Sequence, residues 1–421
     1  MDDSLRLDAR NDERPVRSAV RTAIGVAPRV LFTVLRYTLG VWLRRRFRVR
    51  IHYDARFSAV RPPYVVLANH VNFWDPFLVA IPFAPPVHFI AADGNFRGAL
   101  MRRLMALAGT VPKAKARNDL ESIRALQQLI RERKIIGVFP EGQRSWDGTS
   151  RPVLSGTPKL VRLLQAPVVS VRLRGGYLST PRWTKTLRKG ELHLDVQTIL
   201  TRSEIRHLPR EEVFRRIATS VTHDETKWQR ETGLLFIHPR RAEHAETALF
   251  RCPACGGWDT LHSAGNTLTC GACGFTTWFA PSGTLYEVAP DGTRRYHRYG
   301  SVAAWNVAQL AELDRRLEDP QGPLPLTIDD ADLLTGYRSR VLYPHGSVAI
   351  SLTRDTLTLT GSGYGSGRTR QIPVDTISGV HVQYAHQLEF YSRGRLYVLR
   401  MKRPGDSAYR LEETILAIQR R

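Results

Sequence analysis

The sequence has few cysteines and few acidic residues. Four of its 421 residues are cysteine, and all four fall between Cys252 and Cys273. Disulfide-held secreted scaffolds use cysteine far more densely, so we expect a reduced, intracellular protein. Acidic residues number 39 against 62 lysines and arginines, a formal net charge of +23. This excess predicts an anionic partner, which composition alone leaves open among nucleic acid, phospholipid and a phosphorylated substrate.

The sequence also lacks a run of 18 apolar residues and the basic-then-apolar order of a signal peptide in residues 1–13. The nearest approach to a membrane span is Val30 to Leu43. Arg36 interrupts it and five arginines follow it directly, so we expect neither a transmembrane helix nor export.

A largely disordered chain is excluded as well. Hydrophobic residues make up 42% and charged residues 24% of the sequence, which is ordinary globular usage. A chain of this length is expected to form at least two folded units.

The positive charge is concentrated in two stretches. Residues 14–56 carry eleven arginines and one acid around an apolar core, and residues 97–117 carry six basic residues and no acid. The first stretch is typical of a helix that lies in a membrane interface, with arginines on lipid phosphates. An ordinary helix with a solvated basic face is the alternative.

Short β-rich runs alternate with helical runs between Tyr64 and Leu173. Four runs read as strands buried on both faces, and three as helices: strands at 64–68, 87–91, 135–139 and 168–173, and helices at 98–108, 119–133 and 158–165. This order predicts an α/β domain with a mostly parallel sheet flanked by helices. Ligands of such sheets collect beyond the carboxyl ends of the strands.

The remainder of the chain reads as smaller modules. Residues 211–230 and 301–318 indicate helices, and alternating strands precede a final helix at 407–420. We therefore expect five parts: a basic membrane-interfacial segment (1–54), the α/β domain (55–245), a zinc ribbon (246–280), a linker and helix (281–336), and an antiparallel pleckstrin-homology-like β module with a terminal helix (337–421).

A histidine and an aspartate follow the first of these strands, in the order Asn69-His70-x4-Asp75. Five residues apart, the two side chains would diverge on a continuous helix, so they can meet only if the chain turns between them. Pro76 favours such a turn at Asp75, which would also serve as a helix N-cap. An aspartate on one imidazole nitrogen would leave the other able to accept a proton.

A second polar group follows the third strand, where Glu141, Gly142, Arg144 and Ser145 stand in the run Phe139 to Ser145. The glycine permits close backbone approach, and the guanidinium can grip a phosphate in bidentate fashion. A surface turn is the plainer interpretation.

These residues resemble the glycerolipid acyltransferases typified by 1-acyl-glycerol-3-phosphate acyltransferase. Four blocks match in order: the N-H-x4-D motif at 69–75, a second block at 109–113, the F-P-E-G-x-R-S block at 139–145, and a fourth at 166–169. The sequence departs from the family at Gln143, where threonine is usual. It departs again in the second block, where Lys113, Lys115 and Arg117 replace a single arginine.

The resemblance implies that His70, oriented by Asp75, deprotonates the free hydroxyl of a lysophospholipid. That oxygen would attack an acyl thioester of coenzyme A or acyl carrier protein to make phosphatidic acid, without a metal or redox cofactor. The implied substrate-binding residues are Asn69, Lys113, Lys115, Arg117, Glu141, Gly142, Arg144 and Ser145. Glycerol 3-phosphate or another lysolipid could be the acceptor instead, and a non-catalytic membrane scaffold is the remaining alternative.

The four cysteines form two C-x2-C pairs, Cys252 with Cys255 and Cys270 with Cys273, separated by fourteen residues. Four thiolates at this spacing predict a closed, structural zinc site. Zinc ribbons can bind nucleic acid, but residues 250–280 carry one arginine and one aspartate, so we expect no nucleic-acid partner. Together these features predict a cytoplasmic enzyme, peripheral on an anionic membrane surface.

Overall fold

The computed structural model describes residues 27–113, 120–319, 326–337, 341–361, 368–403 and 405–421, together with Leu324. The chain divides into two compact units. Unit 1 contains the described residues up to Ser145 together with Ser150–Gly176 and Glu191–Asp224. Unit 2 contains Trp146–Thr149, Tyr177–Gly190 and Glu225–Arg421. Two short segments inside the expected acyltransferase domain therefore pack with the C-terminal half of the chain.

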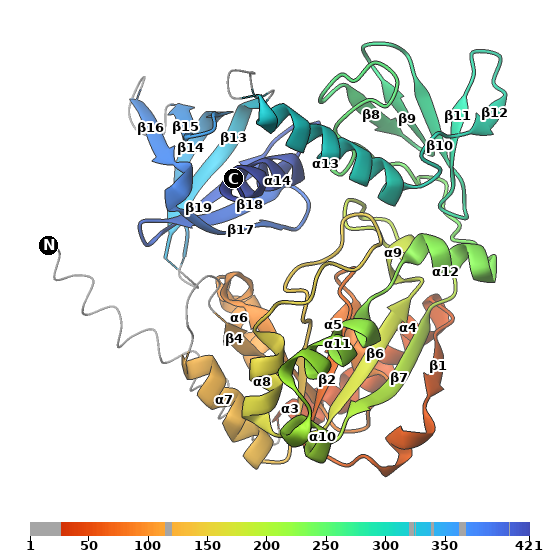
Figure 1. Ribbon diagram of the computed structural model, residues 1–421, viewed down its shortest axis with the longest axis vertical. Helices are drawn as coiled ribbons and strands as arrows, with labels where there is room; N and C mark the ends of the chain where they lie inside the picture. The colour runs from red at the N-terminus through yellow and green to blue at the C-terminus, as the bar shows by residue number, and fades with distance from the viewer. Residues whose placement is uncertain are drawn as a thin grey trace, which may run out of the picture. The chain divides into compact units, whose positions relative to one another are not determined.

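Unit 1 is built on a seven-stranded sheet of order β1-β7-β6-β2-β5-β3-β4. Figure 1 shows β1, β7, β6 and β2 side by side in this order. All neighbours pair in parallel except β6 and β7, which are antiparallel. The predicted α/β class with a mostly parallel sheet is thus confirmed. The strands are β1 (Arg50–Tyr53), β2 (Tyr64–Ala68), β3 (Val87–Ala92), β4 (Val111–Lys113), β5 (Ile135–Val138), β6 (Val168–Arg174) and β7 (His193–Leu200).

Several helices cover this sheet because each of them carries a stripe of buried residues. In α7 the buried residues Ser122, Ala125, Leu126 and Leu129 recur at helical spacing. Ala125, Leu126 and Leu129 join side chains from α8, α10 and α11 in one core against β2, β5, β6 and β7. The helices of this unit, besides the N-terminal ones, are α5 (Asp75–Ala80), α6 (Ala99–Leu107), α7 (Leu120–Arg131), α8 (Thr157–Leu164), α10 (Arg202–His207) and α11 (Arg210–Val221), with short 3-10 turns η2 (Ala55–Ala59) and η3 (Asp93–Phe96).

The basic N-terminal stretch is helical from α3 (Ala27–Leu35) through a π-helical turn η1 (Arg36–Gly40) to α4 (Val41–Arg46). Its Leu43, and Phe47 just beyond it, are fully buried. One side of this helix therefore packs on the unit. The strand β1 follows at once, so the α/β sheet begins before the expected boundary at residue 54.

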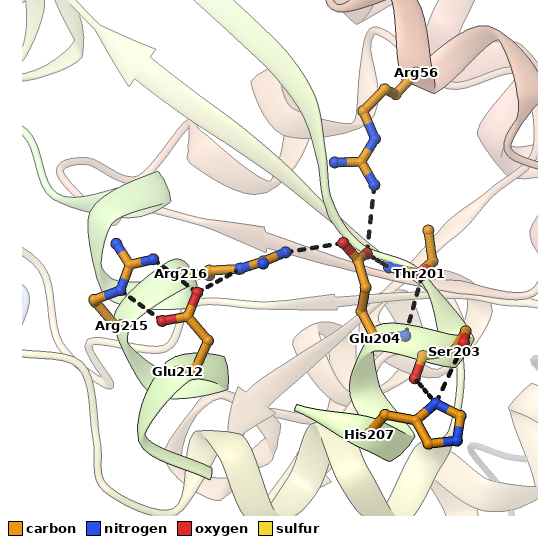
Figure 2. Close-up of polar contacts among 8 residues, drawn as sticks. All are labelled: Arg56, Thr201, Ser203, Glu204, His207, Glu212, Arg215 and Arg216. Carbon is orange, nitrogen blue, oxygen red and sulfur yellow. Dashed lines mark hydrogen bonds and ion pairs between the residues drawn. The ribbon is translucent and has the colours of Figure 1, made fainter. Parts of the chain in front are cut away.

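An ion-pair network joins the elements near α10 and α11 (Figure 2). Thr201 and Glu204 form a capping box, in which each side chain accepts the backbone N–H of the other residue. The Glu204 carboxylate also receives Arg216 at 2.9 Å and Arg56 at 3.4 Å. Arg216 continues to Glu212 at 2.8 Å, which pairs with Arg215 at 2.7 Å. The network links η2 to both helices.

The first part of unit 2 is the cysteine-bearing ribbon. Its five-stranded antiparallel sheet has the order β12-β11-β10-β9-β8. The strands are β8 (Leu261–Ala264), β9 (Thr267–Cys270), β10 (Thr276–Phe279), β11 (Leu285–Val288) and β12 (Arg294–Tyr296). The sequence predicts a linker here, because β11 and β12 are short and are separated by a tight turn at Asp291-Gly292. The ribbon sheet accordingly continues beyond the expected end at residue 280.

The second part of unit 2 is a seven-stranded antiparallel sheet of order β16-β15-β14-β13-β19-β18-β17. A terminal helix packs on β17 and β18 at one end of this half-barrel (Figure 1). The expected antiparallel module with a C-terminal helix is confirmed in this architecture. Its strands are β13 (Thr327–Gly336), β14 (Tyr343–Leu352), β15 (Thr356–Gly361), β16 (Arg368–Pro373), β17 (Ile377–Gln383), β18 (Gln387–Ser392) and β19 (Arg395–Met401).

The module starts earlier than expected, because β13 was assigned to the linker. Its three aspartates hide the strand pattern in the sequence. Asp330 and Asp332 both pair with Lys402, at 2.9 and 3.0 Å. The single helix expected over 211–230 is two helices, α11 and α12 (Glu225–Thr232). Within the described residues, the other elements are α9 (Gly176–Ser179), η4 (Ala245–Thr247), α13 (Val302–Glu318), η6 (Val374–Thr376) and α14 (Ala408–Gln419).

Candidate active site

The loop after β2 brings His70 and Asp75 together. Nδ1 of His70 lies 2.7 Å from Oδ2 of Asp75, which is fully buried. The same oxygen accepts the backbone N–H groups of Val71 at 2.6 Å and Asn72 at 2.9 Å. The carboxylate therefore closes the loop on itself. Asp75 is the first residue of α5 and Trp74 occupies the N-cap position, which corrects the expectation that Asp75 is the cap.

This geometry fixes the protonation pattern of the imidazole. A carboxylate at Nδ1 favours the tautomer that carries its proton there, so Nε2 bears the lone pair. The ring of His70 also stacks on Phe139, with centroids 4.1 Å apart and planes 17° apart. The aspartate and the phenyl ring together hold the imidazole in one orientation.

Glu141 connects the third sequence block to this loop. Because β2 and β5 are parallel neighbours, their carboxyl ends lie at one edge of the sheet. Oε1 of Glu141 accepts the backbone N–H of His70 at 3.0 Å, and Oε2 accepts that of Arg151 at 2.8 Å. Burial raises the pKa of Glu141 to about 8, although these two N–H groups favour the ionised form. Both carboxylate oxygens of Glu141 thus accept hydrogen bonds from backbone N–H groups.

The other residues of the third block differ in accessibility. Ser145 is fully buried, and its N–H donates to the carbonyl of His70 at 2.9 Å. Arg144 is half-buried, and Gly142 is exposed with φ of +71°, where a side chain would be strained. The block therefore offers an exposed backbone turn at Gly142 and a half-buried arginine two residues later.

Asn69, expected among the substrate-binding residues, has no exposed surface. Its amide nitrogen donates to the carbonyl of Leu173 at 2.9 Å, and its oxygen accepts the N–H of that residue at 2.7 Å. Both polar ends are engaged with β6. This arrangement attaches the start of the loop to the neighbouring strand.

The basic residues of the second block lie elsewhere on the sheet edge. Lys113 is exposed at the end of β4. Between β2 and β4 lie β5 and β3, so the separation is three strand spacings, about 14 Å. Lys115 and Arg117 lie outside the described residues. The structure thus brings His70, Asp75, Glu141 and Ser145 together and places Lys113 at a distance.

Two residues of the loop region were absent from the sequence-based site. Phe139 begins the block at 139–145 but is not among the predicted site residues, and its ring stacks on His70. Asn72 accepts the N–H of Trp74 at 2.7 Å and donates to the carbonyl of Gly176 at 2.9 Å. An asparagine whose oxygen bonds two residues ahead is a recognisable turn signal. The contact with Gly176, by contrast, depends on the fold.

The four cysteines converge in the ribbon. Their Sγ atoms all lie within 4.8 Å of one another, with Cys252 3.7 Å from Cys273 and Cys255 3.8 Å from Cys270. Ligands about 2.3 Å from a tetrahedral zinc would lie about 3.8 Å apart, so the donor set fits this ion. All four donors are protein thiols. Such a site is complete without a substrate position.

One part of the chain is similar to a known protein family. Residues 11–174 match the family model described as Acyltransferase. The resemblance carried by the four sequence blocks is thereby confirmed for this part of the chain. That segment covers the described strands from β1 to β6 and both the first and third blocks.

The relatives are 1-acyl-sn-glycerol-3-phosphate acyltransferases. The chloroplastic enzyme of Brassica napus is 28% identical over 141 residues, which are 33% of this chain and 40% of that protein. The Bacillus subtilis enzyme is 23% identical over 151 residues, 35% of this chain and 72% of that protein. The Saccharomyces cerevisiae enzyme is 24% identical over 162 residues, 35% of this chain and 54% of that protein. The similarity thus spans about half the length of these relatives.

The crystal structure of the Thermotoga maritima 1-acyl-sn-glycerophosphate acyltransferase is also similar. It covers 42% of this chain and 70% of its own, with 18% sequence identity and a TM-score of 0.35. Among the residues that the structure describes, no helix combines the length and hydropathy needed to cross a membrane.

Proposed function

We propose that this protein is a 1-acyl-glycerol-3-phosphate acyltransferase. It moves a fatty acyl group from an acyl thioester, either acyl-CoA or acyl carrier protein, to the free hydroxyl of the acceptor and makes phosphatidic acid. The observation that carries the proposal is the 2.7 Å contact between His70 Nδ1 and Asp75 Oδ2 at the carboxyl end of β2. Similarity to three curated acyltransferases supports it.

The chemistry follows from the orientation of the imidazole. Nε2 of His70 takes the proton from the acceptor hydroxyl as its oxygen attacks the thioester carbonyl. Asp75 stabilises the imidazolium that forms. When the tetrahedral intermediate collapses, the C–S bond breaks and the imidazolium returns its proton to the departing thiolate. The new ester and a free thiol account for every atom.

The acceptor phosphate is assigned to Arg144, whose planar guanidinium suits bidentate phosphate binding. Lys113, at the end of β4 and farther along the sheet edge, is assigned to the same acceptor. Lys115 and Arg117, which lie outside the described residues, are assigned to it from the sequence alone. Gly142 offers a backbone approach without a side chain. Asn69, Glu141 and Ser145 contribute indirectly, because their polar groups form hydrogen bonds that fix the loop carrying His70.

An acyl-transfer assay tests the proposal directly. Purified protein with a lysophosphatidate acceptor and acyl-CoA should release free thiol, and His70→Ala should abolish that release. The variant should keep the wild-type melting temperature, because His70 is half-buried. Turnover that survives in His70→Ala would refute the mechanism. Inactivity of the wild type with every acceptor and donor would favour a membrane scaffold instead.

A second acceptor is favoured by one observation. The second block ends in Lys113 where the family usually has arginine, and a lysine binds phosphate as a point charge with less directional demand. Glycerol 3-phosphate or another lysolipid is therefore the alternative acceptor. A panel of acceptors with one acyl thioester separates these possibilities.

We also propose that unit 1 binds an anionic membrane surface, at the cytoplasmic face of that membrane. Large apolar side chains are exposed on the adjacent helices α3 and α6 and on η1, and exposed arginines accompany them. Apolar groups in the interface and arginines on lipid phosphates stabilise such binding. The apolar residues are Val30, Val34, Tyr37, Leu100, Met101, Leu104 and Leu107.

Vesicle flotation measures this binding. Wild-type protein should float with phosphatidylglycerol vesicles and less with phosphatidylcholine vesicles. Leu104→Glu should reduce flotation, whereas Leu163→Glu, an exposed leucine on α8, should not. Equal flotation of both variants would remove the proposed surface.

The ribbon cysteines are proposed to hold one structural zinc ion. The 3.7 and 3.8 Å sulfur separations and the closed set of four thiols support this assignment. Zinc binding would then contribute to the folding free energy of the ribbon.

A further inference from the structure

The chain leaves unit 1 for unit 2 twice directly beside the candidate active site. The first crossing follows Ser145 and the second follows Gly176. The N–H of Ser145 donates to the carbonyl of His70 at 2.9 Å, and Asn72 donates to the carbonyl of Gly176 at 2.9 Å. Ser145 and Gly176, the last residues before the two crossings, are therefore hydrogen-bonded to the loop that carries His70.

Beyond the first crossing, Trp146 is held tightly inside unit 2. It is 3% exposed. The Trp146 ring stacks on the ring of Tyr409 of α14, with centroids 4.5 Å apart. Arg182, in the segment 177–190 of unit 2, places its guanidinium carbon 4.1 Å from the centroid of the Trp146 ring. Tyr409 in turn accepts a hydrogen bond from Asn306 of α13 at 3.0 Å.

The next residue, Asp147, is held by α13 and by its own segment. It accepts a hydrogen bond from Asn306 at 2.8 Å, and the N–H and hydroxyl of Thr149 at 2.9 and 2.6 Å. Asn306 is buried and also accepts the side-chain amide of Gln309 at 2.8 Å. A buried amide with this many partners has one orientation only.

The two crossings also contact each other within unit 2. Gly148 has φ of +90°, and a Cβ there would lie 2.7 Å from Cδ1 of Tyr177. Tyr177 is the first residue after the second crossing and is 4% exposed. Both connections to the His70 loop thus begin in one packed cluster of unit 2.

We infer that Asn306 and Tyr409 are positioning residues for acyl transfer. They fix Trp146 and Asp147, and a single peptide bond carries that placement to Ser145, whose N–H holds the backbone of His70. The inference rests on the proposed function. Reacting atoms held even about 1 Å out of place can lower a rate about 100-fold, so the supporting residues need not touch the substrate.

The experiment compares Tyr409→Leu and Asn306→Leu with two controls. Leu357→Ala on β15 destabilises the same unit in its C-terminal sheet, and Val307→Leu alters an exposed neighbour of Asn306 on α13. Tyr409→Phe keeps the ring on Trp146 and should rescue much of the loss in Tyr409→Leu. All assays run well below the melting temperature of the least stable variant.

Two readouts are measured. The kcat for acyl transfer should fall about 10- to 100-fold in both test variants, with the KM for the thioester unchanged. Amide hydrogen exchange should become faster in peptides covering 68–76 and 140–146, and neither control should change it. A positioning role in the loop would be overturned if exchange there stayed at the wild-type rate, or if Leu357→Ala lowered kcat as much. Since exchange needs no substrate, it tests the inference even if the wild type proves inactive, which would defeat only the proposed function.

Discussion

The carboxylate of Glu141 accepts the backbone N–H of His70 at 3.0 Å, so the third sequence block holds the first through its main chain. The side chain of His70 contacts Asp75 through Nδ1 and stacks on the ring of Phe139. Two carboxylates serve one histidine in different ways: Glu141 locates its backbone, and Asp75 orients its ring.

Replacing Glu141 should change how stability depends on pH. Its pKa is raised to about 8 by burial, above the value of about 4.5 in the unfolded chain. The folded protein therefore binds this proton more tightly, and the resulting stability is lost as pH rises from about 4.5 to about 8. In Glu141→Gln this part of the pH dependence should disappear, although the variant loses one of two buried hydrogen bonds, about 1–2 kcal/mol.

Denaturant unfolding at several pH values checks this expectation. The difference in free energy of unfolding between wild type and Glu141→Gln should shrink with rising pH. Glu231→Gln, at an exposed site, serves as the control. A constant difference from pH 5 to pH 8 would contradict the raised pKa.

Removing Arg144 should weaken acceptor binding selectively. A charged hydrogen bond to phosphate contributes about 1.5–3 kcal/mol, so Arg144→Ala should raise the KM for a phosphate-bearing acceptor about 10-fold or more. The KM for the acyl thioester should stay the same, and Arg144→Lys should recover only part of the loss. Steady-state kinetics with each substrate varied in turn measures this. The matched control is Arg131→Ala at the exposed end of α7; equal effects on both substrates would remove the phosphate role.

Zinc should be bound stoichiometrically and released by a strong chelator. Metal analysis should find one ion per chain in the wild type and a loss in Cys255→Ser. Chelation should lower the melting temperature, because the ribbon has only a small core without its ion. The control is His262→Gln, which changes an exposed nitrogen donor outside the four-sulfur cluster and should keep the metal. Full metal content in Cys255→Ser would contradict the proposed ligand set.

The network of Figure 2 should set part of the acid stability of unit 1. Burial raises the pKa of Glu204, but hydrogen bonds from Thr201 and Arg216 outweigh it and lower the pKa to about 2. The stability from this shift is present above about pH 4.5 and is lost as pH falls towards 2. Glu204→Gln should therefore unfold less steeply on acidification, while Glu231→Gln should follow the wild type. Circular dichroism during acid titration measures both; identical wild-type and Glu204→Gln profiles would show that the network carries no such dependence.

Much of the sheet of unit 1 could be predicted from the sequence because its central strands are buried on both faces. Every residue of β2 is buried, so its apolar run stands out. In β7, buried and more exposed residues alternate, and the sequence of this strand carries the same period of two. The edge strands β1 and β4 have only four and three residues, too few for a periodic signal.

Motif spacing predicted that His70 and Asp75 lie together, but it did not predict which strands and loops the site residues contact. The turn that brings His70 to Asp75 follows from the proline after the aspartate. The engagement of Asn69 with Leu173 depends on which strand lies beside β2, and sequence pattern does not specify that. The same holds for the segments 146–149 and 177–190, whose partners are distant in the chain and leave no local periodicity.

The exchange of segments between the two units has a consequence for synthesis. Trp146 is made early, but Tyr409, on which it stacks, belongs to the last helix of this sequence. A ribosome therefore releases the strands around His70 long before the residues that complete their surroundings exist. A shortened chain that lacks α13 and α14 would contain Trp146 without its stacking partner Tyr409 and Asp147 without its hydrogen-bond donor Asn306.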